Sequence, residues 1–469
     1  MKQFVDRHED MATLEEQYAA EEASFVVICG RRRVGKTALI SKFLEGKRGL
    51  YFLATEESEE QNRTSFRQQV AAFVDDEVLA SASVESWDVL FDRLTQSGER
   101  LVVALDEFQY LGKANAAFPS VFQRIWDTLL SKRNVMVILC GSLISLMMSQ
   151  ALSYDSPLYG RRTAQIHMRQ VPFRFYQDFF DRDLDQRQLL ERYSITGGVP
   201  KYVECFRGTG SIYQLISKQV LNRNSFLFDE PNFLLSKEVV EVGTYFSIIK
   251  AIAAGNHRGG EVAAAMNVRQ TSLTRYLRAL EGLEVLERVV PVTEANPEKS
   301  KKGLYRIKDN YLRFWFRFVF PNLGLLETGH ADQVLAQIER NLVDGHVVYV
   351  FEDVCRQKTW DLAARGELPF VPARIGGWWG AGGVELDVVA VDAEGARVAF
   401  GECKLWQGPV GENVLAQLEE KAERALADRS FKGYGEARVT YLIFSLSGFT
   451  DGLREAAERR GDVLLVGSV

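Results

Sequence analysis

The sequence predicts an α/β protein of several domains, on three observations. Within its first two hundred residues, the short runs SFVVICG, RGLYFLAT, RLVVALDE and NVMVILCGS are almost wholly apolar and alternate with amphipathic stretches. Strands buried on both faces of a parallel sheet have this composition, with helices between them. A mainly helical stretch follows, and a second α/β segment begins near residue 345. With 469 residues, the chain also exceeds what one hydrophobic core usually serves.

Composition narrows the class of protein. Hydrophobic residues make up 46% of the chain and charged residues 26%, as in ordinary globular proteins. No run approaches the eighteen or so apolar residues of a membrane span, and MKQFVDRHEDMATLEEQ is too charged for a signal peptide. The five cysteines form no CxxC pair, which argues against a zinc site and a disulfide framework. We therefore expect a cytoplasmic protein with no membrane partner.

A phosphate-binding loop follows the first apolar run. GRRRVGKT, Gly30 to Thr37, matches G-x-x-x-x-G-K-[ST] and precedes the predicted helix ALISKFLEG. In such a loop backbone N–H groups wrap the phosphates of ATP, and the lysine, here Lys36, reaches the β- and γ-phosphates. Thr37 is expected to ligate Mg²⁺. The expected nucleotide contacts are Gly30, Arg31, Arg32, Arg33, Val34, Gly35, Lys36, Thr37 and Ala38.

Acidic and polar residues end two further predicted strands. Asp106 and Glu107 follow LVVAL, and we expect Asp106 to hold Mg²⁺ and Glu107 to orient or deprotonate the attacking water. Ser142 ends NVMVILCGS, where it could sense the γ-phosphate. Arg161 and Arg162 are candidates for charge at the transition state, but ordinary surface salt bridges are an equally good interpretation of both.

Six strings together resemble the archaeal-type ATPase family, in the STAND branch of P-loop NTPases related to AAA+ proteins. FVDR, GRRRVGKT, LDEFQYL, ILCGS, SPLYGRRT and GGVPKY occur in the order of that family and cover residues 1 to about 235. The resemblance implies that Asp6 and Arg7 lie near the adenine. It also implies that Gly198, Val199 and Pro200 couple the nucleotide to a following winged helix, although the residues alone indicate only a turn there.

A helix-turn-helix with a wing is predicted next. Three helices are predicted from the spacing of SIIKAIAAG, RGGEVAAAMN and RQTSLTRYLRALEGLEVLERV, and Gly255 and Asn267 close the first two. A hairpin rich in lysine and glutamate follows. Leu273, Leu277 and Leu280 form the buried stripe of the third helix. The solvent-facing polar residues are expected to be Arg269, Gln270, Ser272, Arg275 and Arg278, with Lys299, Lys301 and Lys302 at the hairpin tip.

This predicted winged helix is more basic than the rest of the chain. From residue 237 to 313 there are 13 Lys and Arg against 9 Asp and Glu, a balance of +4 where the whole chain carries −6. That sign suits contact with duplex DNA. Two alternatives stay open: a structural lid on the nucleotide domain, and lysines that keep a sheet edge from aggregating.

A second group of charged residues lies in VELDVVAVDAEGARVAFGECKLWQG. Glu402 and Lys404 are two apart on a predicted strand and share a face, and Asp387 on the paired strand can meet them. Two carboxylates and a lysine can hold a divalent metal and activate water for phosphodiester attack, with Asp387 and Glu402 as ligands. Glu352, on a neighbouring predicted helix, could add a third acid.

This second group resembles the PD-(D/E)XK nuclease superfamily, and RIGGWW, ELDVVA and GECK resemble a domain that often follows archaeal-type ATPases. The resemblance implies that Asp387, Glu402 and Lys404 are catalytic, with Glu352 assisting. The chain departs from the motif at Leu386, where proline is usual. A strand pair with surface salt bridges would have a similar sequence and stays open as an alternative.

The predicted fold is thus a P-loop NTPase parallel sheet, a helical region, a winged helix and a restriction-endonuclease-like α/β domain. The expected boundaries are residues 1–180, 181–240, 241–322 and 323–469. The leading hypothesis is an ATPase, with ATP and Mg²⁺ as cofactors, that controls a metal-dependent nuclease acting on DNA. The alternatives are a nucleotide-switched DNA-binding regulator and a signalling scaffold that forms a homo-oligomer with ATP.

Overall fold

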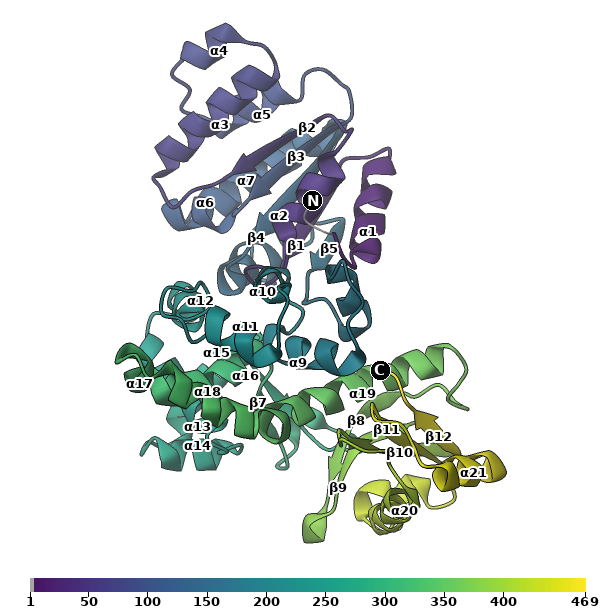
Figure 1. Cartoon of the computed structure of the whole chain (residues 1–469). Helices are drawn as coiled ribbons and strands as arrows, with labels where there is room; N and C mark the ends of the chain where they lie inside the picture. Colours follow the sequence, from purple (N-terminus) through teal and green to yellow (C-terminus); the bar gives the residue numbers. More distant parts are fainter. Residues whose placement is uncertain (1–3) are drawn as a thin grey trace. The chain divides into compact units, whose positions relative to one another are not determined.

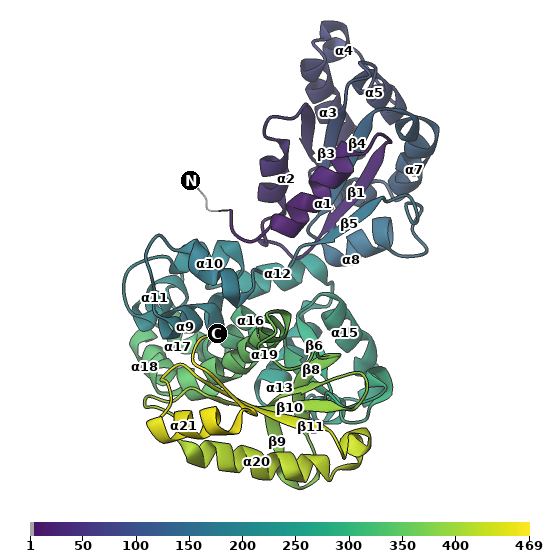
Figure 2. The ribbon, with the colours of Figure 1, turned by 90° about the vertical axis from the view of Figure 1, so that its right-hand side faces the viewer.

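The computed structural model describes residues 4–469 and divides by its internal contacts into two compact units (Figures 1 and 2). Unit 1 runs to Val171 and takes in two later segments, Val199–Lys201 and Asn232–Val240. Unit 2 holds the intervening segments and everything from Glu241 onward. The four domains predicted from the sequence are a finer division, which stays a prediction.

The predicted parallel sheet is present in unit 1. Its five strands pair in parallel in the order β2-β3-β4-β1-β5. Four of them coincide with the predicted apolar runs: β1 (Ser24–Cys29), β2 (Gly49–Leu53), β3 (Leu101–Asp106) and β4 (Val135–Gly141). The fifth, β5 (Ala164–His167), is not among the predicted strands, since only Ile166 of its four residues is buried.

Helices cover both faces of this sheet. Phe25 and Val27 of β1 belong to a core cluster on one face, whereas Val26 and Ile28 belong to a cluster on the other, as alternation along a strand requires. The first face is covered by α3 (Glu59–Phe73), α5 (Trp87–Leu94), α6 (Gln109–Ala114) and α7 (Phe118–Thr128), and the second by α1 (His8–Ala19) and α2 (Lys36–Leu44). Shorter helical segments of unit 1 are α4 (Glu77–Ser81), η1 (Leu130–Lys132), α8 (Ile144–Met147) and the π-helical turn η2 (Met148–Leu152).

The stretch after Val171 is mainly helical, as predicted. α9 ends at Thr196 and α10 begins at Pro200, with Gly197 and Gly198 at positive φ in the turn between them. Residues 331–364 form α18, a π-helical turn and α19 without interruption. The helices are η3 (Phe173–Phe179), α9 (Gln186–Thr196), α10 (Pro200–Phe206), α11 (Ile212–Gln219), α12 (Glu230–Glu238), α16 (Asn310–Phe314), η5 (Trp315–Val319), η6 (Phe320–Asn322), α17 (Leu323–Glu327), α18 (Ala331–Leu342), η7 (Val343–Val347) and α19 (Val348–Ala364).

Three helices and a hairpin occupy the predicted winged-helix region. They are α13 (Val242–Ala253), α14 (Gly259–Ala265) and α15 (Gln270–Gly282), then the antiparallel strands β6 (Leu286–Val289) and β7 (Leu304–Ile307), with η4 (Pro297–Lys299) between the strands. Leu273, Leu277 and Leu280 are buried, as predicted from their spacing. The order of the elements is confirmed, and their assignment as a winged helix stays a prediction.

A separate mixed sheet forms the C-terminal part of unit 2. Its order is β12-β11-β10-β9-β8, antiparallel from β8 to β10 and parallel from β10 to β12. The elements are β8 (Arg374–Trp379), η8 (Ala381–Gly383), β9 (Glu385–Val391), β10 (Arg397–Lys404), α20 (Glu412–Leu426), η9 (Arg429–Tyr434), β11 (Arg438–Ser445), α21 (Asp451–Arg460) and β12 (Val463–Val466). α19 packs against β8, β9 and β10. Among the residues that the structure describes, no helix is long and apolar enough to cross a membrane.

Candidate functional site

The loop between β1 and α2 has an unusual backbone. Gly30, Arg33 and Gly35 have φ values of 148°, 72° and 99°. A Cβ atom on Gly30 would lie 2.3 Å from the carbonyl oxygen of Met168, so only glycine fits there. Arg33 lies in a region that favours glycine, and strain of this kind is typical of functional loops.

Lys36 turns back onto this loop. Its side chain is buried, and its Nζ donates hydrogen bonds to the carbonyl oxygens of Gly30 at 2.7 Å and Arg31 at 2.8 Å. Burial lowers the pKa of Lys36, and the nearby carboxylates of Glu107 and Asp106 counteract part of that effect. A phosphate oxygen would bind this ammonium group more strongly than a neutral carbonyl does.

Asp106, at the end of β3, accepts hydrogen bonds from two hydroxyl groups. Thr37 Oγ1 donates to its Oδ2 at 2.9 Å, and the hydroxyl of Tyr51 on β2 donates to the same atom at 2.6 Å. Burial, and then the hydrogen bond to Asp106, raises the pKa of Tyr51. A hydroxyl and a carboxylate side by side are the oxygen donors that Mg²⁺ prefers, so these residues fit the ion.

Glu107 and Ser142 meet next to this pair. Ser142 Oγ lies 2.9 Å and 2.7 Å from the two carboxylate oxygens of Glu107, and Gln109 Nε2 donates to the same carboxylate. Glu107 has a φ of 53°, which turns the chain sharply at the end of β3. The sequence predicted both Glu107 and Ser142, whereas nothing in it indicated Tyr51 or Gln109.

Arg7 supports the loop from outside. Its Nη2 donates to the carbonyl oxygens of Val34 at 3.1 Å and Arg169 at 2.8 Å. Burial lowers the pKa of Arg7, and Asp10 and Asp6 counteract that effect. Arg7 is therefore fixed beside the phosphate loop, and its predicted place near the adenine stays a prediction.

Helix α12 supplies loop contacts that the sequence did not indicate. The ring centroid of Phe233 lies 5.7 Å from the guanidinium carbon of Arg32 and 5.7 Å from that of Arg33. Glu238 accepts a hydrogen bond from Ser145 Oγ at 3.2 Å, just after β4. Burial raises the pKa of Glu238. The helix thus touches both the phosphate loop and the segment after Ser142.

The two candidate arginines after β4 do not join these groups. Arg161 makes a two-point ion pair with Asp127, with Nε–Oδ1 and Nη2–Oδ2 distances of 3.0 Å. Arg162 lies over the ring of Tyr159, with 5.6 Å between its guanidinium carbon and the ring centroid. The surface ion pair left open by the sequence is what the structure shows for Arg161.

The second predicted group gathers on β9 and β10. Asp387 Oδ2 accepts a hydrogen bond from the backbone N–H of Cys403 at 2.8 Å, which places it beside Glu402 and Lys404. Lys404 Nζ donates to Glu402 Oε1 at 2.7 Å. Lys421, which the sequence did not indicate, reaches from α20 and donates to both oxygens of Glu402 at 2.9 Å.

Glu352, on α19, faces the same carboxylates. Burial, and then the charge of Asp387, raises the pKa of Glu352 to about 7. Burial and the charge of Glu402 raise the pKa of Asp387 in turn. Arg356 links the two, because its Nη2 donates to Glu352 Oε2 at 3.0 Å and its Nε to the carbonyl oxygen of Asp387 at 2.8 Å. The four predicted residues are therefore brought together.

These carboxylates do not form a complete metal cage. Among residues 4–469, no group of three or more His, Cys, Asp or Glu side chains is placed to hold a metal ion. Mg²⁺ often takes only one or two protein carboxylates, with waters and substrate phosphates completing its shell. Asp387 and Glu402 fit that smaller set if the ion replaces one of the two lysines that donate to Glu402.

The residues of the predicted winged helix that were expected to face solvent, at α15 and in the hairpin, lie at the surface. Arg275 pairs with Glu241 at 3.4 Å, and Lys302 pairs with Glu294 at 2.9 Å. All the residues predicted to face solvent are exposed, namely Arg269, Gln270, Ser272, Arg275, Arg278, Lys299, Lys301 and Lys302.

The strand order, the phosphate loop after β1 and the acid pair after β3 define a P-loop ATPase fold. The match to an ATPase domain predominantly from Archaea covers residues 4–206. The Walker-type ATPase PABY2304 of Pyrococcus abyssi has a similar fold, with a TM-score of 0.50 and 21% identity over 67% of this chain and 96% of that one.

The chain belongs to the same family as MJECL04, an uncharacterized protein of Methanocaldococcus jannaschii. The two are 35% identical over 401 residues, which is 86% of this chain and 87% of the relative. Residues 315–423 match a second family, described as archaeal and bacterial proteins of unknown function. That match spans α19, β9 and β10, so it contains Glu352, Asp387, Glu402 and Lys404.

Proposed function

We propose that this protein binds and hydrolyses ATP at the loop between β1 and α2. The observation that carries the proposal is the meeting of Thr37 with Asp106, and of Glu107 with Ser142, around the buried ammonium group of Lys36. These groups come from the carboxyl ends of β1, β3 and β4, where α/β proteins of this type bind their ligands.

Each group has a role in this proposal. Lys36 exchanges its bonds to loop carbonyls for bonds to β- and γ-phosphate oxygens. Thr37 and Asp106 hold Mg²⁺, which when bound neutralises phosphate charge. Glu107 orients the attacking water or accepts its proton, while Ser142 holds the Glu107 carboxylate and senses the γ-phosphate.

Two substitutions test this site. Lys36→Ala should abolish productive ATP binding in isothermal titration, because the loop loses its buried cation. Glu107→Gln should keep ATP binding but lose phosphate release by roughly a hundredfold or more, because an amide cannot act as a base. Glu99→Gln, an exposed acid of unit 1, is the matched control. Normal turnover in the Glu107 variant would exclude its assigned role.

We propose, as a second function, that the C-terminal sheet carries a metal-dependent nuclease. The observation that favours it is the gathering of Asp387, Glu402 and Lys404 on adjacent strands, with Glu352 beside them. Asp387 and Glu402 would hold the metal, and Lys404 would steer the water or stabilise the developing negative charge. ATP binding at the other site would control this activity.

Cleavage assays separate the alternatives. Linear, circular and single-stranded DNA are incubated with Mg²⁺ or Mn²⁺, with and without ATP. Asp387→Asn and Glu402→Gln should abolish cleavage but leave ATP hydrolysis intact, and Glu420→Gln, exposed on α20, should change neither. Salt-sensitive DNA binding without cleavage would favour the nucleotide-switched regulator. Absence of both, with ATP-dependent assembly in sedimentation, would favour the scaffold.

DNA binding through the predicted winged helix has its own test. Arg269, Arg278 and Lys301 are exposed. Replacing all three by alanine should weaken duplex binding and flatten its salt dependence by roughly one unit of slope for each lost phosphate contact. An unchanged slope would show that these side chains do not touch DNA.

A further inference from the structure

A cavity of about 680 Å³ lies within unit 2, well away in sequence from the phosphate loop. Its walls come from the end of α13, the hairpin β6–β7, and the helical stretch from α16 to α19. Its volume falls in the range of small-molecule sites, about 300–1,000 Å³.

The side chains around this cavity have one sign of charge. The lining residues include three arginines and three amides but no aspartate or glutamate. Aromatic and aliphatic side chains make up much of the remainder. The polar lining residues used below are Arg306, Arg313, Arg317, Asn322, Gln337 and Asn341.

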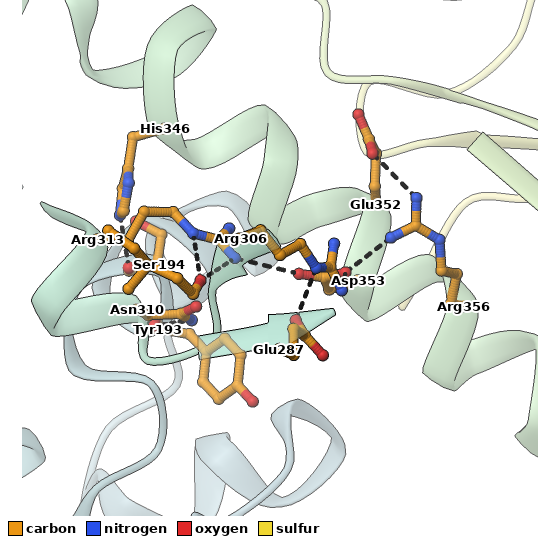
Figure 3. Close-up of polar contacts among 11 residues, drawn as sticks. Tyr193, Ser194, Glu287, Arg306, Asn310, Arg313, His346, Glu352, Asp353 and Arg356 are labelled. Atoms are coloured by element: carbon orange, nitrogen blue, oxygen red, sulfur yellow. Dashed lines mark hydrogen bonds and ion pairs between the residues drawn. The ribbon is translucent and has the colours of Figure 1, made fainter. Parts of the chain in front are cut away.

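Two of the arginines are fixed in place (Figure 3). Arg306 pairs with Glu287 at 2.6 Å and with Asp353 at 2.9 Å, and Arg313 donates two hydrogen bonds to the carbonyl oxygen of Ile307. Arg317 differs from both. Within residues 4–469 it has no ion-pair partner, and its guanidinium carbon lies 5.7 Å from the ring centroid of Phe318.

The backbone beside Arg317 is irregular on both sides. Arg317 lies in the π-helical turn η5, and Gly345, in the π-helical turn η7, lines the same cavity. A Cβ atom on Gly345 would lie 2.8 Å from Arg317 Nη2, so a larger residue there would shift this guanidinium group. π-helical turns are rare and occur frequently at functional sites.

We propose that this cavity binds a nucleoside phosphate, at a site separate from the phosphate loop. Arg317, with Arg313 beside it, binds the phosphate, because guanidinium groups match phosphate oxygens in geometry and charge. Tyr305 and Tyr349 offer rings against which a base can stack. The amides at the cavity wall can both donate and accept, which suits the polar edges of a base. The absence of carboxylates from the lining favours an anion over a cation.

The test uses the full chain carrying Lys36→Ala, so that the phosphate loop does not compete. AMP, GMP, CMP and UMP are titrated calorimetrically beside the four nucleosides that lack the phosphate. At least one mononucleotide should bind ten-fold or more tightly than its nucleoside. Arg317→Gln should weaken that binding ten-fold or more. Arg340→Gln, on an exposed arginine of α18 that does not line the cavity, should leave it unchanged.

A second variant tests whether Arg317→Gln acts on the cavity directly or through a change elsewhere. Ala254 is exposed at the cavity rim, and Ala254→Trp should block the site without disturbing the core. The proposal is overturned if no mononucleotide binds with a Kd below about 1 mM, where the binding free energy is only about −4 kcal/mol. It is also overturned if binding survives both Arg317→Gln and Ala254→Trp, or if inorganic phosphate binds as tightly as every nucleotide.

Discussion

Asp353 holds three arginines together, and its replacement by asparagine should destabilise unit 2 (Figure 3). Its carboxylate lies 2.7 Å from Arg356 Nη1, 2.9 Å from Arg306 Nη2 and 3.8 Å from Arg313 Nη2. Burial alone would raise the pKa of Asp353, but the three guanidinium groups outweigh it and hold the pKa below its usual value.

The expected loss of folding stability follows from the three arginines that Asp353→Asn leaves without their carboxylate partner. Removing one partner of a buried ion pair costs about 3–5 kcal/mol. Because the side chain of Asp353 is 24% exposed, we expect about 2–4 kcal/mol. Glu287→Gln is the matched control: it leaves Arg306 paired with Asp353, so it should cost about 1 kcal/mol or less.

Calorimetry at pH 7 measures both variants. A loss of 2–4 kcal/mol should lower the melting temperature of the unit 2 transition by about 4–8 °C. Because the folded pKa is depressed, the stabilisation is present above the unfolded pKa and is lost as the pH falls through the folded pKa. The difference between wild type and Asp353→Asn should therefore shrink towards pH 3. Equal losses in the two variants would refute the reasoning.

Three shorter predictions concern other parts of the chain. Gly30→Ala, whose Cβ would meet the carbonyl oxygen of Met168, should destabilise unit 1 by roughly 2 kcal/mol or more and abolish ATP binding, as calorimetry and titration would show. In urea unfolding, the stability of Glu352→Gln relative to wild type should be about 2 kcal/mol more favourable at pH 8 than at pH 5.5. The reason is that the raised folded pKa of Glu352, about 7, makes the wild type lose stability as the pH rises through it, whereas glutamine does not titrate. A pH-independent difference would contradict this. Arg161→Ala should leave phosphate release unchanged, since Arg161 pairs with Asp127; a large loss would return Arg161 to the active site.

Local patterns predicted most of the parallel sheet, and tertiary contacts explain what they missed. β1, β3 and β4 are buried at every position, and such runs are recognisable in any sequence. β5 lies at the sheet edge with one buried residue, so it carries no apolar run. Tyr51 reaches Asp106 because β2 pairs with β3, a pairing that no motif records.

Strand periodicity predicted only part of the charged group on the C-terminal sheet. Glu402 and Lys404 share a face because they are two residues apart, and the structure places them in contact. Lys421 comes from α20, and its distance from Glu402 depends on how that helix packs on the sheet. The contact of Phe233 with Arg32 has the same origin, because about two hundred residues separate them in the chain.

Unit 1, which contains the phosphate loop, is not one continuous segment of the chain, so it is difficult to isolate or to exchange by recombination alone. The chain passes between the two units after Val171, Gly198, Lys201, Pro231 and Val240. A fragment that ends at residue 206, where the match to the ATPase domain stops, lacks Phe233 and its contacts with the phosphate loop. No cut at one peptide bond releases unit 1 whole. Recombination between relatives would therefore preserve the nucleotide site only when the gene segment encoding α12 travels with it.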